Sequence, residues 1–196
     1  MCSRFHVAQS RWLQLLRLTA ALLASLLAVL PGSAPAGQAT PTEDEVKAAY
    51  VFNFARFIEW PPAKFAGNTS PLIIGLIGNG PVGDVIGAVI QKKTINNHPL
   101  VLRRLSPADD LTLCHILFVC RSERERFADI VSAVHGAAVL TVGESDQFLE
   151  RGGIINFYVD SETVKFAVNL DSSDQARLKI SSKLLAVAKI VKIKPG

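Results

Sequence analysis

Three short apolar runs constrain the fold of this chain more than any other feature. They occupy residues 72–77 (LIIGLI), 113–119 (LCHILFV) and 137–142 (AAVLTV). Runs of this length with little polar alternation are typical of strands that are covered on both faces, as in parallel sheets. Segments with helical spacing lie between them, at about 81–90 and 122–135. This alternation predicts a three-layer α/β fold, with helices on both faces of a mostly parallel sheet.

The first helix is predicted from its capping residues. Thr42 and Glu45 have the spacing of a capping box, and Pro61 ends the apolar periodicity that follows. The segment carries five aromatic residues: Tyr50, Phe52, Phe54, Phe57 and Trp60. Core packing is the commoner role for any one ring, but five rings cannot share one helix face. We therefore take Phe52, Phe57 and Trp60 as candidates for a partner interface.

The second half of the chain predicts further strands and a closing helix. A strand is expected near 100–105, and residues 154–159 and 163–170 form an expected antiparallel hairpin at an edge of the sheet. Apolar residues between 172 and 191 recur at helical spacing, which predicts a long C-terminal helix. For the four strands before the hairpin, numbered along the chain, we expect the order 2-1-3-4.

The N-terminal segment has the parts of a secretory signal peptide. Arg4, Arg11 and Arg17 precede an uncharged run of about 13 residues, 18–30, which is too short for the roughly 20 residues of a membrane-spanning helix. Small residues follow, and we place cleavage after Ala36. We expect a signal peptide over 1–36, a flexible lead-in over 37–42 and one domain over 43–194. An uncleaved membrane anchor remains the alternative.

If the leader is removed on export, the net charge of +4 does not describe the exported chain. Loss of three arginines with the leader lowers the 21 Lys and Arg to 18, against 17 Asp and Glu, so the exported chain has a formal charge of +1. A nearly neutral chain with only short basic pairs lacks the electrostatic footprint of a nucleic-acid-binding protein. We expect no nucleic-acid partner and a periplasmic location.

The segment 78–83 (GNGPVG) matches the glycine pattern of dinucleotide-binding loops. Arg103 and Arg104 stand where an acidic residue would bind the ribose, and Pro81 removes a backbone amide from the loop. The simpler interpretation is a tight strand-to-helix turn at Gly78 and Gly80, with a small anion at the helix start as a weaker possibility.

No set of residues assembles a catalytic or metal site. Neighbouring side chains on a strand point to opposite faces, so Cys114 and His115 cannot act together as a dyad. Along one straight strand Cys114 and Cys120 would lie roughly 20 Å apart, too far for a disulfide. We expect a buried Cys114, and a Cys120 that is free or bonded between subunits. We expect no cofactor, no metal and no enzymatic activity.

Asn156 and Asn169 interrupt apolar runs, and a glycine pair at 152–153 precedes the first of them. Each asparagine needs hydrogen-bond partners if it is buried, so we expect both to organise backbone. The glycine pair is typical of a turn with positive φ.

Six blocks of the sequence, in order, resemble the YfiR-like family. They are residues 48–61 (AAYVFNFARFIEWP), 114–118 (CHILF), 140–143 (LTVG), 152–157 (GGIINF), 164–169 (VKFAVN) and 181–185 (SSKLL). The resemblance covers about 43–191. It implies a periplasmic, non-enzymatic α/β protein that forms dimers and represses a membrane-bound diguanylate cyclase by binding its periplasmic domain.

The resemblance also implies an OmpA-like outer-membrane lipoprotein that sequesters the repressor, and a role for cysteine redox state. Repressor members hold two disulfides, whereas only Cys114 and Cys120 remain in the exported chain. The two could pair if the strand between them ended early. Redox control through them stays an open expectation.

Two functions follow as hypotheses. The first is a regulator that restrains an inner-membrane signalling protein through protein contacts. The second is a small-ligand binding module with a pocket at the carboxyl ends of the parallel strands, near residues 78–83 and Gly143. The candidate binding residues are Phe52, Phe57, Trp60, Gly78, Gly80, Gly143 and Asn156.

Overall fold

The computed structural model describes residues 40–193. The expected signal peptide, its cleavage after Ala36 and the lead-in over 37–39 lie outside the described residues, as does the expected domain end at residue 194. The helices are α2 (Glu43–Phe57), α3 (Val82–Ile90), α4 (Phe127–Ala133), α5 (Leu170–Gln175) and α6 (Ser182–Leu185). Three 3₁₀ turns are η2 (Pro62–Lys64), η3 (Leu111–Leu113) and η4 (Arg121–Arg126). The strands are β1 (Ile58–Glu59), β2 (Leu72–Ile77), β3 (Thr94–Ile95), β4 (His98–Leu105), β5 (Ile116–Val119), β6 (Leu140–Gly143), β7 (Ile155–Asp160), β8 (Thr163–Asn169), β9 (Lys179–Ile180) and β10 (Lys189–Val191).

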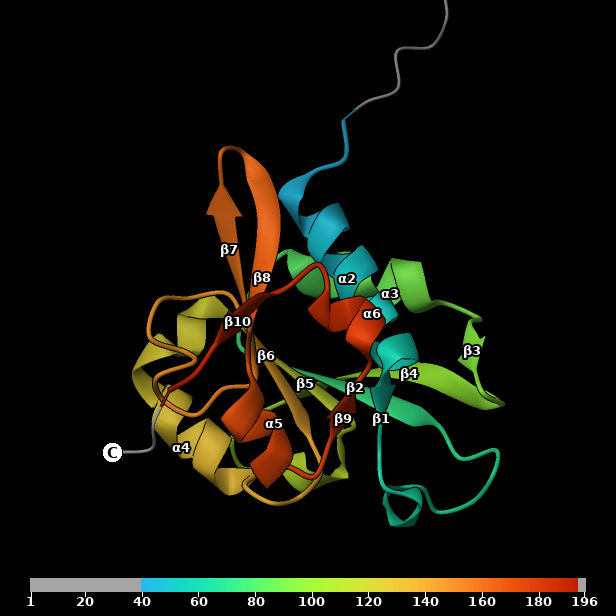
Figure 1. Ribbon diagram of the computed structural model, residues 1–196. Coiled ribbons are helices and arrows are strands. Elements are labelled where there is room, and N and C mark those ends of the chain that lie inside the picture. Colours follow the sequence, from blue (N-terminus) through green and yellow to red (C-terminus); the bar gives the residue numbers. More distant parts are fainter. Residues whose placement is uncertain (1–39, 194–196) are drawn as a thin grey trace, which may run out of the picture. The chain divides into compact units, whose positions relative to one another are not determined.

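One sheet organises the domain (Figure 1). Its strand order within the described residues is β10-β8-β7-β6-β5-β2-β4-β3, and a separate pair joins β1 to β9. Strands β4, β2, β5, β6 and β7 run parallel to one another in that order. The predicted order 2-1-3-4 is therefore confirmed, as is the antiparallel pairing of β7 with β8. This hairpin lies between β6 and the edge of the sheet. Short β10 adds one more strand, parallel to β8, beyond the hairpin.

The apolar strands are covered on both faces, which gives the three layers. Side chains of alternate strand residues enter two separate cores, because successive residues point to opposite faces. Ile116 and Phe118 pack with α2 and α3, whereas Leu117 and Val119 pack with α4. All four are completely buried, as expected for a parallel strand inside an α/β sheet.

The first helix begins as predicted. Thr42 is its N-cap and accepts a hydrogen bond from the Glu45 amide, while the Glu45 carboxylate accepts one from the Thr42 amide. The helix predicted at about 122–135 begins instead as η4 and becomes α-helical only at Phe127. Ser122 does not cap that helix; its hydroxyl accepts a hydrogen bond from the Asn79 amide at 2.9 Å.

The predicted long C-terminal helix is wrong. Two short helices, α5 and α6, and two short strands, β9 and β10, occupy residues 170–191. Arg177 has a φ of 56°, which ends the helical run, and Ile180 pairs with Ile58 across the β1–β9 ladder. Strand pairing at both β9 and β10 outweighs the helical spacing of the apolar residues, because tertiary contacts override local propensity.

Candidate binding site at the carboxyl edge of the sheet

The carboxyl ends of β2, β5 and β6 meet at one edge of the sheet. The chain leaves β2 through α3 and returns at β4 on one side, whereas β5 lies on the other side of β2. Such a switch point is where open α/β sheets bind their ligands. Gly78, Cys120 and Gly143 stand at or just after these three strand ends. The structure therefore brings together residues that the sequence analysis chose separately.

The glycine loop after β2 is packed by protein rather than open to a ligand. Gly78 has a φ of 91°, and a Cβ at this position would lie 2.5 Å from the Ser122 hydroxyl. Gly83 packs against Leu76 and leaves no room for a side chain. These glycines allow a tight turn and close helix–strand packing, as expected. Ser122 already accepts the Asn79 amide that a bound anion would use.

A buried ion pair connects α2 to the end of β6. Lys47 Nζ lies 2.6 Å from Glu144 Oε2 and 2.6 Å from Glu43 Oε1. The Lys47 side chain is 6% exposed and that of Glu144 is 12% exposed. Burial lowers the pKa of Lys47, but the hydrogen bonds and charges of Glu144 and Glu43 outweigh it, so the pKa is raised overall. The ammonium is held charged inside the domain.

Glu144 also fixes the loop that follows β5. Its second carboxylate oxygen accepts a hydrogen bond from the Arg121 amide at 3.2 Å, and its backbone carbonyl accepts one from Arg121 Nη2 at 3.1 Å. One carboxylate thus joins three elements: the first helix, the loop after β5 and the loop after β6. The sequence analysis missed Lys47 and Glu144, because no local pattern pairs residues 97 positions apart.

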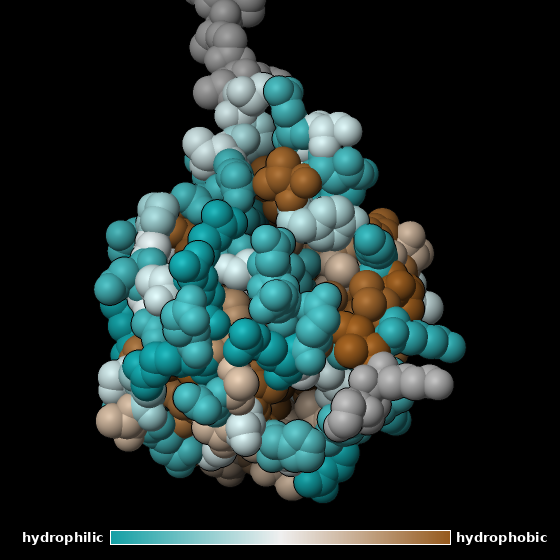
Figure 2. Space-filling view, turned by 90° about the vertical axis from the view of Figure 1, so that its left-hand side faces the viewer, coloured by the Kyte–Doolittle hydropathy of each residue, from teal (hydrophilic) through white to brown (hydrophobic). Residues whose placement is uncertain are grey.

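A wide depression of about 620 Å³ opens beside this network. Arginines and carboxylates line it together with aromatic residues of the hairpin: Arg121, Arg124, Glu125, Glu144, Ser145, Asp146, Gln147, Arg151, Phe157, Tyr158 and Val159. Figure 2 shows the left-hand side of the Figure 1 view, where most side chains are hydrophilic and apolar ones gather toward its right. The depression lies beside the carboxyl end of β6, but the predicted residues Gly78, Gly80 and Gly143 do not line it.

The arginines of this depression differ in how their charge is balanced. Arg124 contacts Glu125 at 3.1 Å, whereas Arg121 and Arg151 form no salt bridge with any residue in 40–193. Arg151 donates only to the Gln147 amide oxygen, at 3.4 Å. Since Lys47 balances Glu144, two guanidinium groups are left with spare donors toward solvent. Such groups suit a carboxylate or phosphate on a ligand or partner.

Asn156 and Gly143 shape the loop at the floor of the site. Asn156 Oδ1 accepts a hydrogen bond from the Ser145 amide at 3.1 Å. A Cβ on Gly143 would overlap the ring of Phe148, which is completely buried. The predicted backbone-organising role of both asparagines matches these contacts, since Asn169 likewise accepts from the Ser172 amide and donates to the Leu149 carbonyl. Gly152, with a φ of 91°, makes the expected positive-φ turn.

The candidate aromatic residues Phe52 and Phe57 of α2 and Trp60 after β1 do not line this depression, and they differ in exposure. Trp60 is buried in the core, and its indole N–H donates to the His115 carbonyl at 3.1 Å. Phe52 and Phe57 are half-buried against the same core. Lys93 Nζ lies 4.3 Å from the centre of the Phe52 ring, and Arg56 stands over Phe57.

Both cysteines are buried free thiols, Cys114 in the core beneath α4 and Cys120 in the core beneath α2 and α3. Burial raises the pKa of each thiol to about 11, and the charge of Glu144 adds to the effect at Cys120. They lie on opposite sides of the sheet and are not paired, although β5 ends at Val119, before Cys120.

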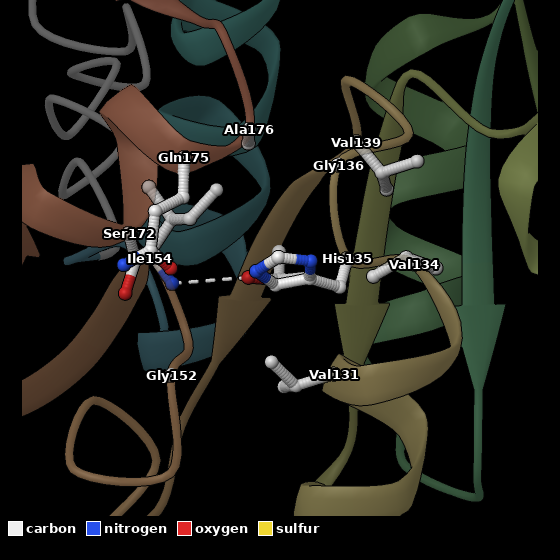
Figure 3. Close-up of a pocket in the computed structure, with 11 residues that line it drawn as sticks. Val131, Val134, His135, Gly136, Val139, Gly152, Ile154, Ser172, Gln175 and Ala176 are labelled. Carbon is white, nitrogen blue, oxygen red and sulfur yellow. Dashed lines mark hydrogen bonds between the residues drawn. The ribbon is translucent and has the colours of Figure 1, made fainter. Parts of the chain in front are cut away.

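A much smaller cavity of about 30 Å³ lies between α4, α5 and the start of β6 (Figure 3). Ile154 donates its amide to the Thr141 hydroxyl at 3.0 Å beside it. This volume is about that of one water molecule, so the depression is the better candidate for a binding surface.

The whole domain matches the sequence model of the YfiR/HmsC-like family over residues 44–189. The chain belongs to this family. The family is regulatory, non-catalytic and periplasmic, and it is associated with cyclic-di-GMP signalling. Within residues 40–193 no helix is long and apolar enough to cross a membrane, and no three His, Cys, Asp or Glu residues gather as a metal-binding group.

A crystal structure of a conserved domain protein from Vibrio cholerae O1 biovar El Tor has a similar fold, with a TM-score of 0.56 and 12% sequence identity. The alignment covers 77% of this chain and 60% of that one, so this family member spans less than two thirds of the other protein. At this identity the likeness concerns the fold alone. No curated protein matches the chain.

Proposed function

We propose that this protein is a periplasmic regulator that represses an inner-membrane signalling protein, in the first place a diguanylate cyclase, by binding its periplasmic domain. The observation that carries the proposal is the family match over residues 44–189. Repression requires differential affinity: the regulator must bind the inactive state of its partner more tightly than the active state. A preference of about 100-fold corresponds to roughly 2.7 kcal/mol.

The proposal extends to other partners of the regulator. An OmpA-like outer-membrane lipoprotein would sequester it, and the regulator itself would act as a homodimer. Both expectations derive from the family resemblance. Sequestration relieves repression by mass action, since regulator bound to the outer membrane is lost to the inner-membrane partner.

The test is affinity capture with tagged protein in the source organism, followed by mass spectrometry of solubilised membranes. The proposal expects one inner-membrane protein with a periplasmic sensor domain and a cytoplasmic signalling domain. Deletion of the gene should then raise the cellular concentration of cyclic-di-GMP, and reintroducing the intact gene should return it to the original level. Unchanged cyclic-di-GMP and unchanged output of every neighbouring sensor after deletion would refute the proposal.

A second candidate function, a small-ligand binding module, is favoured by the depression at the carboxyl edge. Arg121 and Arg151 have spare donors there, so an anionic metabolite is the ligand class that fits. Thermal-shift screening should give a stabilising ligand whose effect is lost in Arg151→Gln and kept in Arg126→Gln, a change outside the depression. A screen without any hit would count against this candidate. The two functions are compatible if the ligand tunes repression.

A further inference from the structure

The sheet ends at β10, whose outer edge has no strand partner within residues 40–193. This strand pairs only with β8, through Lys189, Ile190 and Val191. The backbone N–H and C=O groups on its far side therefore point away from the sheet. An open edge of this kind can accept an extended segment of another protein as an additional strand.

Exposed apolar side chains gather at the same edge. The described chain has four large apolar residues with high exposure, and two of them are Val187 at 67% and Ile190 at 42%. The other two, Leu113 and Val159, lie on different elements. An added strand would cover Ile190 with an apolar residue of its own, and Val187 lies two residues before the start of β10.

The charge of this edge indicates the chemistry of the added strand. Residues 182–193, which hold α6 and β10, contain three lysines, Lys183, Lys189 and Lys192, and no acidic residue. Lys183, Lys189 and Lys192 are exposed or nearly so and form no salt bridge with any residue in 40–193. Lys189 Nζ instead lies 5.8 Å from the centre of the Tyr158 ring.

These lysines disfavour a second copy of the chain at this edge. A copy paired through its own β10 would bring the same lysines together, and lysine on an edge strand is a common protection against such self-pairing. A segment with acidic residues would instead be stabilised at this edge, because opposite charges directly across a strand pair attract each other, whereas the like charges of a second copy would repel.

We propose that the outer edge of β10 binds an extended segment of the signalling partner in which acidic and apolar residues alternate, as an additional strand of the sheet. This inference rests on the proposed function, since it identifies the surface through which the regulator contacts its partner. The depression then remains available to a ligand while the partner is bound.

The experiment places a photo-cross-linking amino acid at each of the four exposed apolar positions of the full-length chain in the source organism. Positions 187 and 190 report on the β10 edge, position 159 on the rim of the depression, and position 113 on a distant surface. The cross-linked peptides are identified by mass spectrometry. We expect adducts from 187 and 190 with one segment of the captured signalling protein, in which acidic and apolar residues alternate.

The alternatives give different adducts. Cross-links from 187 and 190 to a second copy or to lipid would overturn the inference, as would cross-links to the signalling protein from 159 or 113 alone. In the last case the proposed function stands and only the location is wrong. If no position cross-links to a membrane signalling protein and capture also fails, the proposed function itself fails.

Charge reversal provides a matched control. Lys189→Glu and Lys192→Glu should each lower the cross-linking yield from position 190 by roughly two- to fivefold, the range expected for one exposed ion pair. Lys92→Glu makes the same charge change at the turn after α3 and should leave the yield unchanged. Equal yields in all three variants would exclude an acidic partner strand.

Discussion

The ion pair between Lys47 and Glu144 is predicted to stabilise the domain far more than an exposed pair with the same geometry. The comparison pair is Lys165–Asp160, which also has an N–O distance of 2.6 Å. Its side chains are 46% and 52% exposed, whereas those of Lys47 and Glu144 are 6% and 12% exposed. Distance is therefore held constant and burial is the variable.

The expected magnitudes follow from these exposures. Removing one member of a buried pair costs about 3–5 kcal/mol, because the other charge is left without a partner. Glu43 remains 2.6 Å from Lys47 and is half exposed, so part of that cost is recovered. We expect Glu144→Gln to lower the free energy of unfolding by about 2 kcal/mol. Water screens an exposed pair, so we expect Asp160→Asn to lower the free energy of unfolding much less than Glu144→Gln does.

Double-mutant cycles measured by urea unfolding test this reasoning. The first combines Lys47→Met with Glu144→Gln and the second combines Lys165→Met with Asp160→Asn. We expect a coupling energy of at least about 1.5 kcal/mol in the first cycle and a clearly smaller one in the second. Equal coupling energies in the two cycles would refute the argument that burial strengthens the Lys47–Glu144 pair.

Three further predictions concern the cores on either side of the sheet. Burial, together with the positive charges of Lys64 and His98, lowers the pKa of His115 to about 4, below the usual 6.5. The unfolded state binds this proton more tightly, so the free energy of unfolding should fall as the pH drops from 6.5 toward 4, by about 2 kcal/mol at pH 4.5. An identical pH dependence in His115→Asn would contradict this. Burial raises the pKa of each thiol to about 11, so a thiol reagent at pH 7 should modify Cys114 and Cys120 only after unfolding. Rapid labelling of the native protein would be inconsistent with their burial. Gly143→Ala should lower the free energy of unfolding by about 1–3 kcal/mol, because the added methyl group would overlap the Phe148 ring. Gly67→Ala is the control: a Cβ there would have no atom within 4 Å, so the change should be nearly neutral. Similar values for the two variants would contradict the packing argument.

The sheet could be predicted from sequence because its strands are marked locally. Continuous apolar runs such as 72–77 are long enough to fix both strand identity and burial, and right-handed crossover connections limit the possible orders. The C-terminal segment lacks such a mark. Its apolar residues fit a helix and a strand equally well, and the choice depends on pairing with β1 and β8, which no local pattern shows.

The candidate site was predicted only in outline. The switch point follows from strand order, so the pocket at the carboxyl edge could be expected from the sequence. Lys47, Arg121 and Glu144 could not, because each belongs to a different element and only the fold brings them together. Conversely, Trp60 is conspicuous in the sequence yet donates to the His115 carbonyl inside the core.

The central claim is that this protein represses an inner-membrane signalling enzyme by binding its periplasmic domain. The most direct measurement reconstitutes the captured partner in vesicles, adds increasing amounts of the purified regulator to its periplasmic side, and records cyclic-di-GMP synthesis. The account predicts that synthesis falls with added regulator and saturates, and that heat-unfolded regulator has no effect. Binding to the partner at saturation with synthesis unchanged would contradict the account.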